Sequence, residues 1–500
     1  MAEHPDGGGG RAQLLRRYRR AKDRRQAWEA HWQECYDYAL PLRDAVMHRP
    51  NPGEKKGDRL FDGTAPDAVD QLAASLLSEL TPPWAQWFGL TAGAALTPEE
   101  RETVAPLLDR IGAVLQSHFD RSNFAVEMHQ CYLDLITGGT ASLLFEEAGP
   151  GGHSAFRFTA VPLAQVVLEE GAEGRLDVTF RRSEPNAAAL AARFPDASLP
   201  EATARRLTED PELRLAMVEA VVPDGHGYRY TALLDGDDDT DTVLAEGRFA
   251  QSPFVNFRWL KAPGETYGRS PVMKALPDIK TANKVVELVL KNATIAVTGI
   301  WQADDDGVLN PANVRLVPGT IIPKAVGSAG LQPLEAPGRF DISQLVLDDL
   351  RGRIRHALLA DKLGQPDAPR MTATEVLERA SDMARLLGAT YGRLQSELLT
   401  PLVMRAVAIL RRRGEIPELV LDGHIADLEY RSPLAQSQAR RDARNTLTWL
   451  GALAQLGPAG VDAVDGGEAA RWLGRTLGVP AELIRPQAPM SRQAPGAGHA

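Results

Sequence analysis

The sequence predicts an α+β fold that is mainly helical, and three observations support this. Two long stretches, Arg11 to Leu40 and Met371 to Gly414, carry apolar residues at helical spacing. From about Ser142 to Trp259 the apolar period shortens to two, as in strands with one buried face. Two more amphipathic helices flank a segment rich in Pro and Gly, 295–340. Helices and strands that are segregated in this way are typical of α+β proteins.

The composition is that of an ordinary globular protein, with 44% hydrophobic and 24% charged residues in a chain of 500. No apolar run approaches the ~18 residues that span a membrane, and the first ten residues do not resemble a signal peptide. Cys35 and Cys131 form neither a metal-ligand pattern nor a disulfide framework, so we expect a reducing, intracellular compartment and no metal or cofactor. The net charge of −10 argues against a surface that grips nucleic acid everywhere.

The N-terminal helix is basic in its first half and aromatic in its second half. The basic residues between Arg16 and Arg25 spread around most of the helix, which favours a solvated or subunit-facing helix over one that binds nucleic acid. Trp28, Trp32 and Tyr36 recur on one face. Aromatic residues at this spacing are more typical of core or subunit-interface anchors than of platforms on which bases stack.

Three further helices precede the strands, and the strands are expected to be antiparallel. The helices are predicted over 64–80, with Thr64 as N-cap, over 98–119 and over 124–137. A short helical insertion, about 186–213, interrupts the strands. Two acidic clusters favour turns over divalent-cation sites because they lack the Gly and Glu positions of a calcium loop. They consist of Asp235, Asp237, Asp238, Asp239 and Asp241, and of Asp304, Asp305 and Asp306.

Two helices flank the Pro- and Gly-rich segment. The first is predicted over 270–292, with Ser270 as N-cap and Pro271 in its first turn. The second is predicted to start at a cap formed by Asp341 and Gln344 and to end near Ala360. A loop over 361–370 then leads into the longest helix.

The longest helix is predicted over 372–414. Thr372 and Glu375 form a capping box at its start, and Gly414 marks its end. At 1.5 Å per residue it would be about 60 Å long. Pro401 lies inside it, removes one backbone hydrogen bond and is expected to kink it. Small helices are expected after it, followed by a disordered tail over 485–500.

Several short motifs stand in a fixed order between about Trp28 and Gln438. They are Leu60–Ala65, Leu80–Trp84, Tyr267–Pro271 with Asn283, Met371–Val376, Arg393–Leu402 and Ser432–Ala435. Each is weak alone, and the ordered set resembles the portal, or head-to-tail connector, proteins of short-tailed bacteriophages. The resemblance covers most of the chain, and its most specific part is the long helix.

This resemblance implies a portal-type ring subunit. Its regions would be a wing (1–269 together with the long kinked helix 372–414), stem helices (270–293 and 341–360), a clip (294–340), a tunnel loop (361–371) and a crown-type helical end (415–484). The ring, usually of twelve subunits, would lie at one capsid vertex, where double-stranded DNA is packaged and ejected and where head and tail are joined. Implied partners are the terminase, capsid and scaffolding proteins, and tail or adaptor proteins, in the virion and, during assembly, in the host cytoplasm. No enzymatic activity and no membrane partner are expected.

Five basic residues are candidates for contact with DNA in such a channel: Lys280, Lys284, Lys291, Lys362 and Arg370. The first three fall on one face of a helix, where they would meet phosphates without sequence specificity. The alternative is a solvated outer face on which Glu287 pairs with Lys284. The other two belong to the tunnel loop, which is equally well explained as an ordinary connection.

Two other functions compete with the portal. One is a structural adaptor ring of a phage particle that does not conduct DNA. The other is a metal-dependent nucleic-acid enzyme that uses the acidic clusters. The sequence contains no P-loop, zinc motif or nucleophile elbow, so we predict no catalytic residue and no metal ligand.

Overall fold

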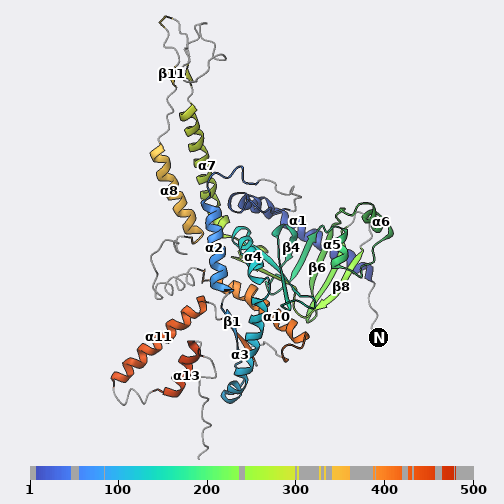
Figure 1. Ribbon diagram of the computed structural model, residues 1–500, viewed down its shortest axis with the longest axis vertical. Coiled ribbons are helices and arrows are strands. Elements are labelled where there is room, and N and C mark those ends of the chain that lie inside the picture. The colour runs from blue at the N-terminus through green and yellow to red at the C-terminus, as the bar shows by residue number, and fades with distance from the viewer. Residues whose placement is uncertain are drawn as a thin grey trace, which may run out of the picture.

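The computed structural model mixes helices and strands, as predicted (Figure 1). It describes residues 7–46, 56–83, 85–235, 242–298, 301–302, 326–327, 332–333, 340–360, 387–388, 390–418, 426–430, 433–456, 464–477 and 479. The expected tunnel loop, the predicted capping box of the long helix and the C-terminal tail lie outside these ranges. Within them, none of the helices has the length and apolar character needed to cross a membrane.

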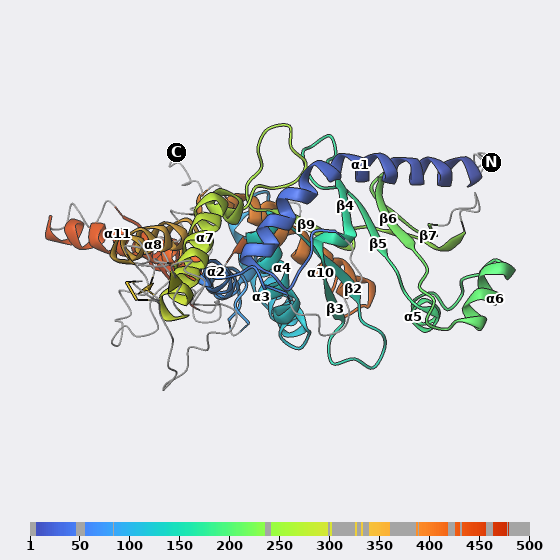
Figure 2. The same ribbon diagram turned by 90° about the horizontal axis from the view of Figure 1, so that it is seen from above.

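Four helices form the N-terminal part: α1 (Gly7–Ala39), α2 (Thr64–Leu80), α3 (Pro98–Asp120) and α4 (Phe124–Gly138). α1 lies along the sheet side of the molecule at one end and reaches the main core at the other (Figure 2). Trp32 and Tyr36 are fully buried there, which confirms their assignment to the core. The predicted cap of α2 is wrong, because Gly63 is the N-cap and Thr64 is already helical. The Thr64 amide instead donates to the Asp62 carboxylate.

Two antiparallel sheets account for the region with a period of two. One has the order β3 (Phe156–Val161), β2 (Thr140–Glu147), β9 (Phe254–Arg258). The other has the order β4 (Val166–Glu169), β5 (Val178–Ser183), β6 (Met217–Asp224), β7 (Gly227–Leu234), β8 (Val243–Phe249). A short 3-10 turn, η1 (Leu163–Gln165), precedes β4. The predicted insertion is confirmed as α5 (Ala187–Arg193) and α6 (Glu201–Glu209), between β5 and β6.

A third pairing was not predicted. β1 (Phe88–Ala92) pairs antiparallel with β12 (Ala426–Tyr430) over five residues. Each strand is short and has no partner nearby in sequence, so neither gives a local signal. The pairing ties the N-terminal helices to the segment that follows the long helix.

α7 (Pro271–Thr298) and α8 (Phe340–Ala357) form a hairpin that projects from the body (Figure 1). The Ser270 cap is confirmed, since the Met273 amide donates to the Ser270 hydroxyl at 2.9 Å. α7 continues past the predicted end near 292 because helix-compatible residues persist until Gly299. α8 begins at Phe340, so Asp341 lies inside the helix rather than at its cap. Between the two helices, β10 (Trp301–Gln302) pairs antiparallel with β11 (Gln332–Pro333).

The described part of the long helix begins at 387 and contains a π-helical turn. This turn is η3 (Gln395–Leu399), and α10 (Thr400–Arg412) follows it directly. The Thr400 amide donates to the Gln395 carbonyl, five residues back. The irregularity expected at Pro401 therefore takes the form of a wider turn just before it, which is a common way to accommodate a lost backbone hydrogen bond. Gly414 has a positive φ of 71°, as its predicted place at the helix end requires.

Two C-terminal helices follow, α11 (Pro433–Gln455) and α13 (Gly466–Thr476), which confirms the expected helical end. Trp449 and Trp472 are about half exposed on them.

Candidate functional site: the α7–α8 hairpin and its base

Of the three candidate lysines of α7, Lys284 and Lys291 are exposed and Lys280 is partly buried, and each contacts a carboxylate. Lys280 lies 3.1 Å from Glu34 of α1. Lys284 and Lys291 lie 2.9 Å and 2.6 Å from the two oxygens of Glu287. Hydrogen bonds from both lysines hold the pKa of Glu287 below its usual value. The lysine face, defined as these three lysines, thus meets two carboxylates and keeps one excess positive charge.

The remaining candidates lie outside the described residues. Lys362 and Arg370 belong to this group, as do four residues of the first acidic cluster and all of the second. Asp235 is described and follows the end of β7, in the connection to β8. Among the described residues, no group of three or more His, Cys, Asp or Glu side chains could hold a metal ion.

The two helices of the hairpin pack through an apolar stripe on α8. Leu347, Leu350 and Ile354 are buried, while Leu345 on the other face is 74% exposed. An ion pair of 2.8 Å joins Arg353 of α8 to Asp278 of α7. The stripe and the ion pair therefore join the two helices, while four large apolar side chains of the hairpin stay at least 44% exposed among charged neighbours: Leu288, Leu290, Leu345 and Val346.

The first motif singled out in the sequence, Leu60–Ala65, forms one half of the base of the hairpin. The Asn283 side-chain oxygen accepts the Phe61 and Asp62 amides at 2.6 Å and 3.1 Å. Its amide nitrogen donates to the Arg59 carbonyl at 2.9 Å. One buried Asn of α7 thus satisfies three backbone groups of the loop before α2.

Asp62 fixes α8 to the same loop. Its buried carboxylate pairs with Arg351 at 2.8 Å. Burial raises the pKa of Asp62, but hydrogen bonds from Thr64 and Arg351 outweigh burial and lower it overall. Asp62 is therefore held as a carboxylate that can pair with Arg351 of α8. Since Asn283 of α7 bonds to the same loop, both helices of the hairpin depend on the loop over 59–64.

The second motif, Tyr267–Pro271, forms the other half of the base. Gly268 lies against Gly139, and a Cβ on Gly268 would lie 2.1 Å from the Gly139 carbonyl oxygen. The Ser270 hydroxyl donates to the Thr137 carbonyl at 2.9 Å. Tyr267 packs edge-on against Trp32 at a centroid distance of 4.9 Å. The segment at Gly268 can approach Gly139, the residue that ends α4, this closely only because neither glycine has a side chain.

A buried ion pair connects the base to the long helix. Arg258, at the end of β9, is fully buried and donates to Glu397 of η3 at 2.7 Å. The Arg258 backbone amide also donates to Glu397 at 3.0 Å. This pair was not predicted from the sequence. Its one local signal is a carboxylate inside the apolar stripe of the Arg393–Leu402 motif.

Three of the motifs that carry the resemblance therefore meet around the base of one projecting hairpin: Leu60–Ala65, Tyr267–Pro271 with Asn283, and Arg393–Leu402. They supply side-chain hydrogen bonds to the backbone, a close contact between two glycines, and buried ion pairs. This arrangement is suited to hold the helices in place.

Comparison with known proteins identifies the family of the chain. The model of the bacteriophage head to tail connecting protein family matches residues 11–484. The chain is 27% identical to the probable portal protein of Bordetella phage BPP-1, over 97% of this chain and 90% of that protein. It is 23% identical to the portal protein of Salmonella phage epsilon15, over 95% and 88%. It is 22% identical to that of Escherichia phage T7, over 80% and 75%.

Among solved structures, a chain in the virion of a native gene transfer agent particle aligns with a TM-score of 0.38 and 13% identity, covering 88% of this chain and 99% of that one. The family model spans nearly the whole sequence, and the portal relatives align over most of their lengths. The chain belongs to the family of bacteriophage head to tail connecting proteins.

Proposed function

We propose that this chain is the subunit of a portal ring at the capsid vertex, which joins head to tail and through which double-stranded DNA is packaged and ejected. Family membership and the portal relatives support this function. The structural observation that carries it is the α7–α8 hairpin, which projects from the body and leaves Leu288, Leu290, Leu345 and Val346 at least 44% exposed. In a closed ring with head-to-tail contacts, neighbouring subunits supply the surface that covers such side chains.

The hairpin would form the stem, and the segment between its helices, with the β10–β11 ladder, would form the clip. The wing would consist of the residues before Ser270 together with the long helix, and the C-terminal helices would form the crown. The loop over 361–371 would line the tunnel. The clip would be the dock for the terminase and later for tail components. No step in this function requires the chain itself to be an enzyme.

The lysine face would meet DNA in the channel. Its three lysines are about half exposed, and two carboxylates already contact them. The logarithm of the DNA-binding constant falls linearly with the logarithm of the salt concentration, and each phosphate that a protein neutralises steepens this slope by about 0.9. With one excess charge per subunit, contact would remain weak at any one phosphate, so that DNA could move. Lys362 and Arg370 would add to this contact from the tunnel loop.

Electron microscopy of the purified protein tests the ring. We expect rings of about twelve subunits with an open axial channel. A closed ring without an open channel would favour the non-conducting adaptor. A monodisperse monomer at high concentration would contradict both. Metal-dependent nuclease activity that is lost in Asp235→Ala would favour the enzyme.

The lysine face is tested by replacing Lys280, Lys284 and Lys291 with Gln together. Ring assembly should persist, while DNA packaging or retention changes. The matched control is Lys274→Gln, an exposed lysine on another face of α7, which should change neither. If the triple variant fails to assemble while the control assembles, the lysine face belongs to the subunit interface instead.

A further inference from the structure

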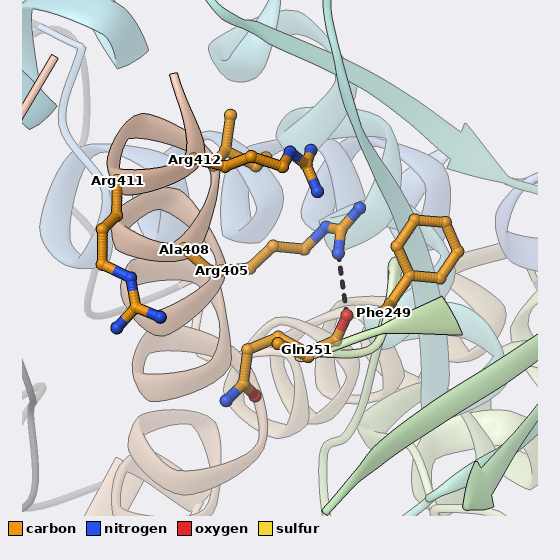
Figure 3. Close-up of a pocket in the computed structure, with 8 residues that line it drawn as sticks. Phe249, Gln251, Arg405, Ala408, Arg411 and Arg412 are labelled. Carbon is orange, nitrogen blue, oxygen red and sulfur yellow. Dashed lines mark hydrogen bonds between the residues drawn. The ribbon is translucent and has the colours of Figure 1, made fainter. Parts of the chain in front are cut away.

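A pocket of about 330 Å³ lies between α10 and the end of β8 (Figure 3). Its walls include Phe249, Gln251, Arg405, Ala408, Ile409 and Arg412. We call it the Arg405 pocket. Its volume lies at the lower end of the range of small-molecule sites.

Arg405 is 5% exposed and uses only part of its hydrogen-bonding capacity. Its Nε donates to the Phe145 carbonyl at 2.6 Å, and its Nη1 donates to the Gln251 carbonyl at 2.8 Å. A guanidinium carries five N–H donors, so three remain without a partner in the described part of the chain. Within the same part, no carboxylate forms an ion pair with it.

A buried charge without a counter-ion is costly. Burial, and then the nearby Arg412, lower the pKa of Arg405 to about 10. The rings of Phe145 and Phe249 lie 5.6 Å and 5.2 Å from the guanidinium carbon and offset part of this cost. The guanidinium therefore has aromatic and carbonyl neighbours and forms no ion pair in the described part of the chain, while Glu146 and Glu147 offset the lowering of its pKa only in part.

Two further arginines line the pocket. Arg412 extends from α10 in the same direction as Arg405, and Arg411 points away from them (Figure 3). Arg412 is paired with Glu147. Arg411 lies 3.9 Å from Glu418, whose side chain is 83% exposed.

We propose that the Arg405 pocket binds one oxyanionic group, a carboxylate or a phosphate, through the free N–H donors of Arg405 with Arg412 as a second cation. The planar guanidinium matches both groups, since parallel N–H donors can meet two oxygens at once. The group could come from two sources. One is a small anion in solution, and the other is an acidic side chain of a neighbouring copy of this chain. Only the second source rests on the proposed ring.

Titration of the isolated subunit with inorganic phosphate and with glutarate tests the binding. The unfolding temperature of the wild type should rise saturably with each anion. Ala408→Leu fills the pocket without changing any charge, and it should weaken the response at least about tenfold. Arg412→Gln should weaken it by about tenfold, as expected for the loss of one charged donor. Arg206→Gln, which removes an exposed arginine in the last turn of α6, should respond like the wild type.

Assembled rings distinguish the two sources. If the anion comes from solution, rings and subunits should both respond, and Ala408→Leu should assemble normally. If a neighbouring copy supplies it, rings should not respond, and Ala408→Leu should give fewer rings. The proposal is overturned if subunits do not respond and Ala408→Leu assembles normally, or if Ala408→Leu keeps the wild-type response. A wild type that forms no rings would contradict the proposed function. The titration of the subunit would still show whether the Arg405 pocket binds an anion.

Discussion

The Arg258–Glu397 pair offers a direct test of what holds the long helix to the body. Arg258 is fully buried, and the Glu397 side chain is 8% exposed. Arg258→Gln leaves this carboxylate without its buried partner, which should cost about 3–5 kcal/mol. The change also removes hydrogen bonds to the Gly174 and Thr266 carbonyls, each worth about 1 kcal/mol or more. We therefore expect a loss in the upper half of that range.

The same carboxylate supplies its own control. Arg393 also pairs with Glu397, at 2.9 Å, but it lies four residues away on the same helix and its side chain is 28% exposed. Arg393→Gln should cost only about 0.3–0.5 kcal/mol. Hydrogen exchange measures both as the free energy of opening of the amides in β9 and η3. Equal losses in the two variants, or a loss below about 1 kcal/mol for Arg258→Gln, would refute the argument.

Three further predictions concern the base of the hairpin. Gly268→Ala should lower the unfolding temperature and expose the amides of α7 to hydrogen exchange, because the new Cβ would meet a backbone carbonyl. The control Gly247→Ala, which has open space around its Cβ, should leave the α7 amides protected. The folded pKa of Asp62 lies below the ordinary 3.8, so its stabilisation is present above about pH 4 and is lost as the pH falls through the folded value. The protection factors of the α8 amides, which are corrected for the intrinsic exchange rate, should therefore fall in acid in the wild type. In Asp62→Asn they should be low already at pH 7, since the ion pair with Arg351 is missing. Asn283→Ala leaves three backbone groups without their hydrogen-bond partner and should lower the free energy of unfolding, measured in urea, by about 2–4 kcal/mol. A loss below about 1 kcal/mol would show that water replaces the side chain.

Local features of the fold could be predicted because their causes lie within a few residues. The Ser270 hydroxyl caps a helix that starts at the next residue, and Gly414 supplies the left-handed backbone at a helix end. The period of two marks the strands themselves, and β4 to β8 also pair in their order along the chain, whereas β9 pairs with the distant β2. The α2 helix starts one residue earlier than predicted, with the Thr64 amide bonded to the Asp62 carboxylate, and α8 starts two residues earlier than a cap at Asp341 predicts.

Features that join distant segments could not be predicted. β1 and β12 are two short strands whose pairing depends on the whole intervening fold. Glu397 interrupts an apolar stripe, but nothing near either residue in the sequence indicates that Arg258 and Glu397 pair in a buried place. The π-helical turn before Pro401 depends on Thr400, whose hydroxyl bonds to Tyr430 of β12 at 2.6 Å as well as to the Gln395 carbonyl. The two pairings arise from tertiary contacts, and at the π-helical turn a tertiary contact adds to the local effect of Pro401.

The carboxylates beside the lysine face reconcile an acidic chain with the proposed passage of DNA. A face with three unpaired lysines, repeated around a ring, would release many counterions and hold DNA tightly at low salt. Glu287 lies between Lys284 and Lys291 and offsets one of their charges. The Glu287→Gln variant should therefore strengthen DNA retention and steepen its salt dependence, without touching any lysine. If the salt dependence of retention in Glu287→Gln equals that of the wild type, the lysines face away from DNA, and the net charge of −10 alone governs the passage.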